Sequence, residues 1–188
     1  MSETLTLTPA REKGLLLTLA GIQFCHILDV MIIMPLAPML MRTFTFTAAQ
    51  FGLLISAYTF MAAISSILAA MVIDRFDRRQ VILSFFAAFI VATALCAVAT
   101  SYHMLLFMRG LAGVFGGVLG SLVHVFIADC IPYERRGHAT GKVTASFSVA
   151  VILGVPGSLL LVNHIPLIGW RAPFIVVAMI GAAVWWLA

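Results

Sequence analysis

One acidic side chain lies inside a long hydrophobic stretch of the sequence, where it could bind and release a proton. Counted at about 1.5 Å per residue from Gly14, Asp29 lies roughly 22 Å along this stretch. An acid near the centre of a bilayer costs about 2.5 to 3.5 kcal/mol on insertion scales. Proton binding or contact with a wet cavity would relieve that cost. We therefore expect Asp29 to be a proton- or substrate-binding group, with a structural hydrogen bond inside a helix bundle as the alternative.

Other polar side chains share the hydrophobic stretches with Asp29. His26 stands three residues earlier, hence on the same face of a helix. Arg109 lies about 9 Å from the end of a later stretch by residue rise, where it either turns inward or extends to the membrane surface. His124, deeper in that stretch, is either packed in the bundle or exposed to a cavity. The residues expected to line a mixed apolar and polar cavity for small amphipathic molecules are Gln23, His26, Met34, Tyr58 and His124.

A cluster of charges interrupts the apolar sequence at "MVIDRFDRRQVI", residues 71 to 82. Its arginines can anchor a loop on the cytoplasmic side of a membrane. A carboxylate and arginines at helix ends can also form charge-assisted bonds that hold one conformation and break in another. We predict such a cytoplasmic gate, with two acids from a later loop as further members. Its residues are Asp74, Arg75, Arg78, Arg79, Asp129 and Glu134.

The composition indicates which elements must position these side chains. Of the 188 residues, 63% are hydrophobic and 10% are charged, whereas a soluble domain has about 25% charged residues. A helix needs about 20 apolar residues to cross a hydrocarbon core of roughly 30 Å. The sequence therefore predicts an all-α integral membrane protein embedded in a lipid bilayer. Its six expected membrane-spanning helices are residues 14–41, 47–73, 80–99, 103–128, 139–162 and 171–188.

Positive charge sets the expected orientation, since Lys and Arg in short loops are retained on the cytoplasmic side. With the N-terminus inside, eight of these residues are cytoplasmic and two, Arg42 and Arg171, are outside. Residues 1–13 are then a polar cytoplasmic tail without a helical pattern. We expect a multi-pass protein of the inner (plasma) membrane. The net charge of +4 is a topology signal rather than a nucleic-acid footprint, because the basic residues sit at helix ends.

Glycine, proline and cysteine have positional meaning in such helices. Helix bending is expected at Pro35, Gly154, Pro156 and Gly157. Glycines at three- and four-residue spacing predict close helix contact, as static packing or as a sliding surface; they are Gly113, Gly116, Gly117 and Gly120. The cysteines show no C-x-x-C pair, so we expect packing thiols and neither a disulfide framework nor a metal site; they are Cys25, Cys96 and Cys130. No cofactor is expected.

Several short segments resemble the major facilitator superfamily. "IDRFDRRQVI" is similar to its signature loop, Gly-x-x-x-Asp-Arg-x-Gly-Arg-Arg/Lys, with Ala70 and Asp77 in place of the two glycines. "LLFMRGLAGV" resembles the family's Arg-x-x-x-Gly element, with its arginine at Arg109. "ADCIPYERRGHATG" resembles the loop between the fourth and fifth helices. "ILGVPG" looks like the antiporter element of the fifth helix, and "GWRAPF" like the opening of the sixth.

The resemblance is greatest to twelve-helix drug/proton antiporters, including their sugar-efflux branch. It implies that residues 14–188 form the N-terminal six-helix half, a nested three-plus-three inverted repeat, with the C-terminal half absent. It also implies that Arg109 faces inward and influences proton transfer at Asp29 electrostatically. The counterpart of Asp74 contacts a helix end of the other half when such a transporter is open outward, and the arginines pair with loop acids. Asp77 adds a negative charge that the family lacks.

Two functions remain open at this stage. The first is proton-coupled efflux of a drug, sugar or metabolite by alternating access, with a C-terminal half as partner. The second is an isolated half that folds as a bundle or pairs as a homodimer, without transport by the single chain. An enzyme is disfavoured because almost no residues lie outside the membrane. A channel lacks a filter-like repeat or a ring of acids.

Overall fold

The computed structural model describes residues 9–72, 77–165 and 168–188, and the described residues are almost entirely helical. The expectation of an all-α membrane fold is confirmed. Within these ranges, five helices are long and apolar enough to cross a membrane, and a shorter apolar helix completes the six spans. The elements are α1 (Pro9–Phe44), α2 (Ala48–Val72), α3 (Arg78–Ala97), α4 (Tyr102–Cys130), α5 (Tyr133–Val149), a π-helical turn (Ala150–Gly154), α6 (Val155–His164) and α7 (Arg171–Leu187).

Two helices begin earlier than their apolar sequence predicts. The expected boundary at Gly14 is corrected to Pro9, because proline is favoured in a first turn, where its missing N–H is not needed. The expected boundary at residue 139 is corrected to Tyr133, directly after Pro132. Both helices therefore extend in polar sequence beyond the apolar part. There Glu12 of α1 forms an ion pair with Arg135 of α5, at 3.0 Å.

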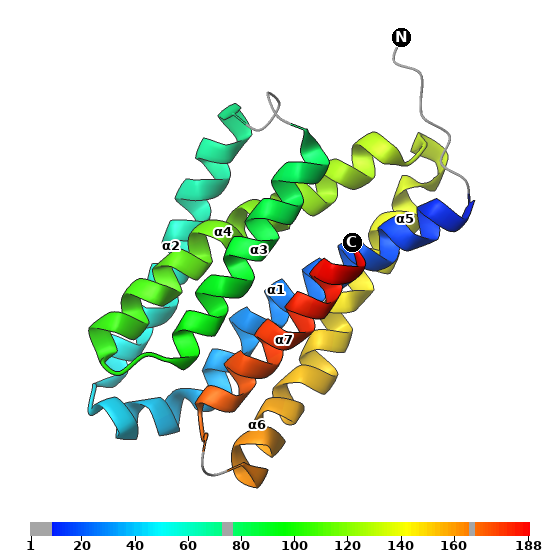
Figure 1. Cartoon of the computed structure of the whole chain (residues 1–188). Coiled ribbons are helices and arrows are strands. Elements are labelled where there is room, and N and C mark those ends of the chain that lie inside the picture. Colours follow the sequence, from blue (N-terminus) through cyan, green and yellow to red (C-terminus); the bar gives the residue numbers. More distant parts are fainter. Residues whose placement is uncertain (1–8, 73–76, 166–167) are drawn as a thin grey trace.

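The helices alternate in direction, as Figure 1 shows, so that the start of α1, the end of α2, the start of α3 and the connection between α4 and α5 lie at one end of the bundle. We call this the N-terminal end and the opposite one the far end. The contacts follow an exchange between the first three spans and the last three. α2 packs against α4 as α5 packs against α1, and α3 packs against α4 as α7 packs against α1. Because α1 and α4 run in opposite directions, this pattern is that of an inverted three-plus-three repeat.

The two central spans are α1 and α4. Half of the most apolar window of each is buried inside the bundle, against 17% for α2 and for the fifth span, Tyr133–His164. Functional side chains on α1 and α4 are therefore held on several sides by neighbouring helices. The outward faces of α2 and of α5–α6 carry large exposed apolar side chains, which suit lipid or a second membrane domain.

Glycines bring α2 against α4. A Cβ on Gly113 would overlap the backbone oxygen of Tyr58, and one on Gly117 would overlap the backbone oxygen of Ala62. Only glycine permits this approach, which is the usual use of small residues four apart between membrane helices. The close contact places the Tyr58 side chain beside the centre of α4.

The fifth span is widened rather than broken. Residues Ala150–Gly154 form a π-helical turn, and the helix then continues through Pro156. A Cβ on Gly154 would overlap a methyl group of Leu28 on α1, so the glycine admits that side chain. α1 likewise stays helical through Pro35 and Pro38, and its last turns bend away from the line of the rest in Figure 1.

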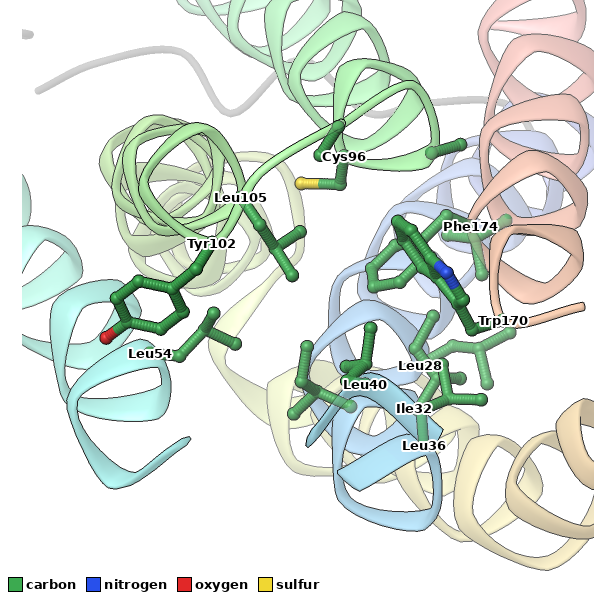
Figure 2. Close-up of a cluster of buried hydrophobic side chains, with 14 of the residues drawn as sticks. Leu28, Ile32, Leu36, Leu40, Leu54, Cys96, Tyr102, Leu105, Trp170 and Phe174 are labelled. Carbon is green, nitrogen blue, oxygen red and sulfur yellow. The ribbon is translucent and has the colours of Figure 1, made fainter. Parts of the chain in front are cut away.

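Apolar side chains fill the far end of the bundle, where α1, α4 and the start of α7 meet. Figure 2 shows Trp170 and Phe174 beside a row of residues on α1, with Leu54, Tyr102 and Leu105 across from them. Burial of such side chains removes them from contact with anything but protein. This packing holds α1 and α4 together on the far side of the polar site. The row on α1 is Leu28, Ile32, Leu36 and Leu40.

Candidate functional site

An ion pair lies at the centre of the bundle. Arg109 of α4 donates from Nη1 to Oδ2 of Asp29 on α1, at 2.7 Å. The side chain of Arg109 is 1% exposed and that of Asp29 is 0% exposed, so both are enclosed by the bundle. Arg109 thus turns inward and does not extend to the membrane surface. Each charge is neutralised by the other, which is how an ionised pair can persist away from water.

Two further helices complete the surroundings of this pair. Thr93 of α3 donates from Oγ1 to the second carboxylate oxygen of Asp29, at 3.2 Å. The guanidinium carbon of Arg109 lies 4.4 Å from the centre of the Tyr58 ring on α2, within the range of a cation–π interaction. Groups from α1, α2, α3 and α4 therefore meet at one point. The carboxylate of α1 is in direct contact with α3 and α4, and α2 contacts it only through Arg109.

Four buried polar atoms near this pair have no hydrogen-bond partner within the part of the chain that the structure describes. A buried polar group without a partner costs about 1 to 3 kcal/mol. Such a group therefore indicates either a bound water molecule or a functional role that compensates for the loss of stability. The atoms are Gln23 Oε1, His26 Nδ1, the Tyr58 hydroxyl oxygen and Arg109 Nε.

The structure separates the predicted cavity residues by burial. Tyr58 is buried, Gln23 and His26 are half-buried, and Met34 is 56% exposed. His124 of α4 is exposed, so it is not packed inside this bundle. Their role as cavity residues stays a prediction.

The charged cluster after α2 is described only from Asp77 onward, and Asp74 and Arg75 lie outside the described residues. Arg78, at the start of α3, forms an ion pair with Asp129 at the end of α4. Asp77 accepts a hydrogen bond from the backbone N–H of Arg79, at 2.9 Å, and thereby caps α3. The extra acid has a structural function, because it begins a helix.

Two other gate candidates have different surroundings. Arg79 donates to the backbone oxygen of Ala188, at 3.1 Å. Glu134 is exposed in the first turn of α5, where an acid is favoured by the helix dipole. The acid that pairs with the neighbouring Arg135 is Glu12, which the motif does not include.

Thr93, which donates a hydrogen bond to Asp29, was not predicted from the sequence. A single threonine in an apolar span gives little warning, since its hydroxyl usually bonds the backbone of its own helix. Its position on the buried face of α3 emerges only when the helices are packed. Buried charges that join helices of an apolar, inverted-repeat bundle are typical of membrane transporters.

Comparison with known proteins identifies the family. The model of the Major Facilitator Superfamily matches residues 19–188, and the chain therefore belongs to this superfamily. It is 30% identical over 128 residues to the uncharacterized MFS-type transporter YwfA of Bacillus subtilis, covering 68% of this chain and 31% of that protein. It is 27% identical over 147 residues to multidrug resistance protein 2 of Bacillus subtilis, covering 78% of this chain and 36% of that protein.

The fold is similar to that of solved transporters. A bacterial homologue of the human lysosomal transporter Spinster, inward-facing and unoccupied, superimposes with a TM-score of 0.82 at 21% identity. The match covers 97% of this chain and 44% of that one. The chain thus spans about a third of the length of the curated relatives named above.

Proposed function

We propose that this chain is the N-terminal half of a secondary transporter that exports small molecules in exchange for protons. The observation that carries the proposal is the buried ion pair between Asp29 and Arg109. Membership of the superfamily and the similarity to multidrug resistance protein 2 support transport and efflux. The substrate is a drug, sugar or metabolite, and the protein lies in the inner (plasma) membrane with the N-terminal end in the cytoplasm.

Proton binding at Asp29 is the proposed coupling step. A proton on Asp29 removes the counter-charge of Arg109, which cannot lose its own proton in a protein. The guanidinium then remains with the Tyr58 ring as its near neighbour, and its best new partners are water or a bound substrate. Because the carboxylate joins α1, α3 and α4 through two hydrogen bonds, protonation favours a different packing of these helices.

The pair of Arg78 and Asp129 is the proposed cytoplasmic gate within this half. It ties the start of α3 to the end of α4 at the N-terminal end. Asp74 and Arg75 are proposed to extend the gate toward the C-terminal half, with Arg79 and Glu134 at its margin. Charge-assisted bonds at helix ends can hold one conformation and release in the other.

The second half of the transporter, or a second copy of the chain, is proposed to pack on the outward faces of α2 and of α5–α6. These faces carry exposed apolar side chains that include Phe60, Ile67 and Leu159. Met34 and His124 would then line the substrate cavity between the halves. Chain mass in detergent distinguishes a homodimer from a single longer chain.

The test is transport by the full-length protein in proteoliposomes with an imposed pH gradient. Wild type should accumulate a fluorescent cationic dye such as ethidium against its gradient, and Asp29→Asn should not. Exchange of dye across the membrane without a pH gradient serves as the control, because it needs no net proton movement. Undiminished accumulation by Asp29→Asn would refute proton coupling through this residue.

A further inference from the structure

Two of the unpaired polar atoms lie on α1, on the N-terminal side of the ion pair. Asp29, His26 and Gln23 are spaced three residues apart on α1, so each is a helical neighbour of the next. At about 1.5 Å per residue, this row covers about 9 Å of α1 on the N-terminal side of the ion pair. The polar row therefore extends from the buried carboxylate to Gln23, and buried side chains that follow it on α1, such as Leu19 and Leu16, are apolar.

Glycines on α4 make the space for this row. A Cβ on Gly116 would overlap the Tyr58 hydroxyl oxygen and lie 3.1 Å from Cδ2 of His26. A Cβ on Gly120, one turn further along α4, would lie 3.5 Å from Cε1 of His26. The Tyr58 hydroxyl and the His26 ring thus lie against the same glycine, and the imidazole continues along the same face of α4. The ring also meets Phe89 of α3 edge-on, with 6.1 Å between ring centres.

The positions of these groups suit a hydrogen-bonded path. The Tyr58 hydroxyl, His26 Nδ1 and Gln23 Oε1 are buried and lack a protein partner within the described residues. Water can both donate and accept, and buried water is commonly held by two to four polar groups of this kind. Imidazole is suited to pass protons because it can take up a proton on one nitrogen and release one from the other.

We propose that Tyr58, His26 and Gln23 hold a file of water that carries protons to and from Asp29 along α1, on the N-terminal side of the ion pair, inside this half of the transporter. The inference rests on the proposed function, since it supplies the route to the carboxyl that couples transport. The path lies along α1, against α4 and the Tyr58 side chain of α2. The proton moves as a charge along the file: His26 accepts it from water on one side and releases another to water on the other.

The charges that act on His26 come from two helices. Asp29 on α1 and Arg109 on α4 influence the ring electrostatically. Cys25 precedes His26 on α1, the Tyr58 hydroxyl lies against the same glycine of α4, and α3 contributes Phe89. Because Asp29 and Arg109 offset each other, proton uptake at Asp29 and charge on His26 are linked. A relay role for His26 changes the rate at which Asp29 is protonated, whereas a purely electrostatic role changes the pH at which Asp29 titrates. The experiment must therefore measure the rate.

The experiment is a pH jump on the full-length protein in nanodiscs, followed by time-resolved infrared spectroscopy of the protonated carboxyl band. The band is assigned to Asp29 by its absence in Asp29→Asn. His26→Phe keeps an aromatic ring beside Phe89 and should slow protonation of Asp29 by about a hundredfold, the lower end of what a positioned proton donor contributes. Tyr58→Phe keeps the ring over Arg109 and should also slow it. Cys25→Ala, beside His26 in sequence but apart from the unpaired atoms, should leave the rate unchanged.

Chemical rescue separates a relay from a change in packing. Imidazole added to His26→Ala should restore the rate, whereas imidazole should have no effect on His26→Phe, whose ring fills the site. Unchanged rates in both His26 variants, or a shift of the titration midpoint without a change in rate, would overturn the relay. Absence of an Asp29 carboxyl band in wild type at every pH at which the protein is folded would instead overturn the proposed function.

Discussion

Separating the two charges of the central ion pair should produce a large and asymmetric loss of stability. In Asp29→Leu, Arg109 remains 1% exposed and keeps its charge at any accessible pH. Breaking a buried pair costs about 3 to 5 kcal/mol, and the Tyr58 ring, 4.4 Å from the guanidinium carbon, recovers part of this. We expect a loss of about 3 kcal/mol in the free energy of unfolding, or roughly 150-fold in the folding equilibrium.

The partner variant Arg109→Met should behave differently with pH. It leaves Asp29 buried without a counter-charge, but a carboxylate can be neutralised by binding a proton. The loss of stability in Arg109→Met should therefore be large at neutral pH and shrink as the pH falls. The loss in Asp29→Leu should persist at both pH values. This contrast follows from which of the two groups can discharge.

The double variant Asp29→Leu/Arg109→Met closes the cycle. Replacement of a buried pair by apolar side chains of similar size is often neutral or stabilising, so the double variant should be more stable than either single variant. Unfolding in mixed detergent micelles at two pH values measures all four proteins. Additive losses in the double variant would refute the ion pair as an energetic unit.

Three smaller perturbations test the surroundings of the site. Gly117→Ala should destabilise the protein by about 1 to 3 kcal/mol, because its Cβ would meet the backbone of Ala62. The control Gly52→Ala should not, because its Cβ would meet no other atom. Equal melting temperatures for the two variants would contradict the close crossing of α2 and α4. Thr93→Val removes the second hydrogen bond of Asp29 and should cost about 1.5 kcal/mol, measured by the same unfolding assay. Asp77→Ala should lower stability by about 1 kcal/mol through loss of the α3 cap, whereas Asp77→Asn should retain it; equal losses in the two variants would show that charge, not capping, matters.

The sequence predicted the class of fold because each membrane span can be recognised from its own apolar composition. The six apolar stretches and the resemblance of "IDRFDRRQVI" to the family loop both depend on local residues. The ends of α1 and α5 were predicted less well, since they extend into polar sequence where proline and acids support a helix. Hydropathy measures where a membrane ends, and a helix can continue past it.

The site was only half visible in the sequence. Asp29 stood out because a charge in an apolar span is costly, and Arg109 stood out through its motif. Thr93 and the contact of Tyr58 with the guanidinium depend on which faces of α2 and α3 turn toward α4. The face of α2 is set by its close contact with Gly113 and Gly117 of α4, which becomes evident only when the two helices are packed together. The sequence reveals a charged side chain that is costly to bury more readily than it reveals the partners that stabilise that side chain.

The central claim is that Asp29 couples substrate movement to proton movement. The measurement that tests it most directly records internal pH and ethidium release together in proteoliposomes of the full-length protein. Wild type should move protons inward as ethidium leaves, and Asp29→Asn should release ethidium down its gradient without a change in internal pH. Equal proton movement in Asp29→Asn and wild type would contradict the account.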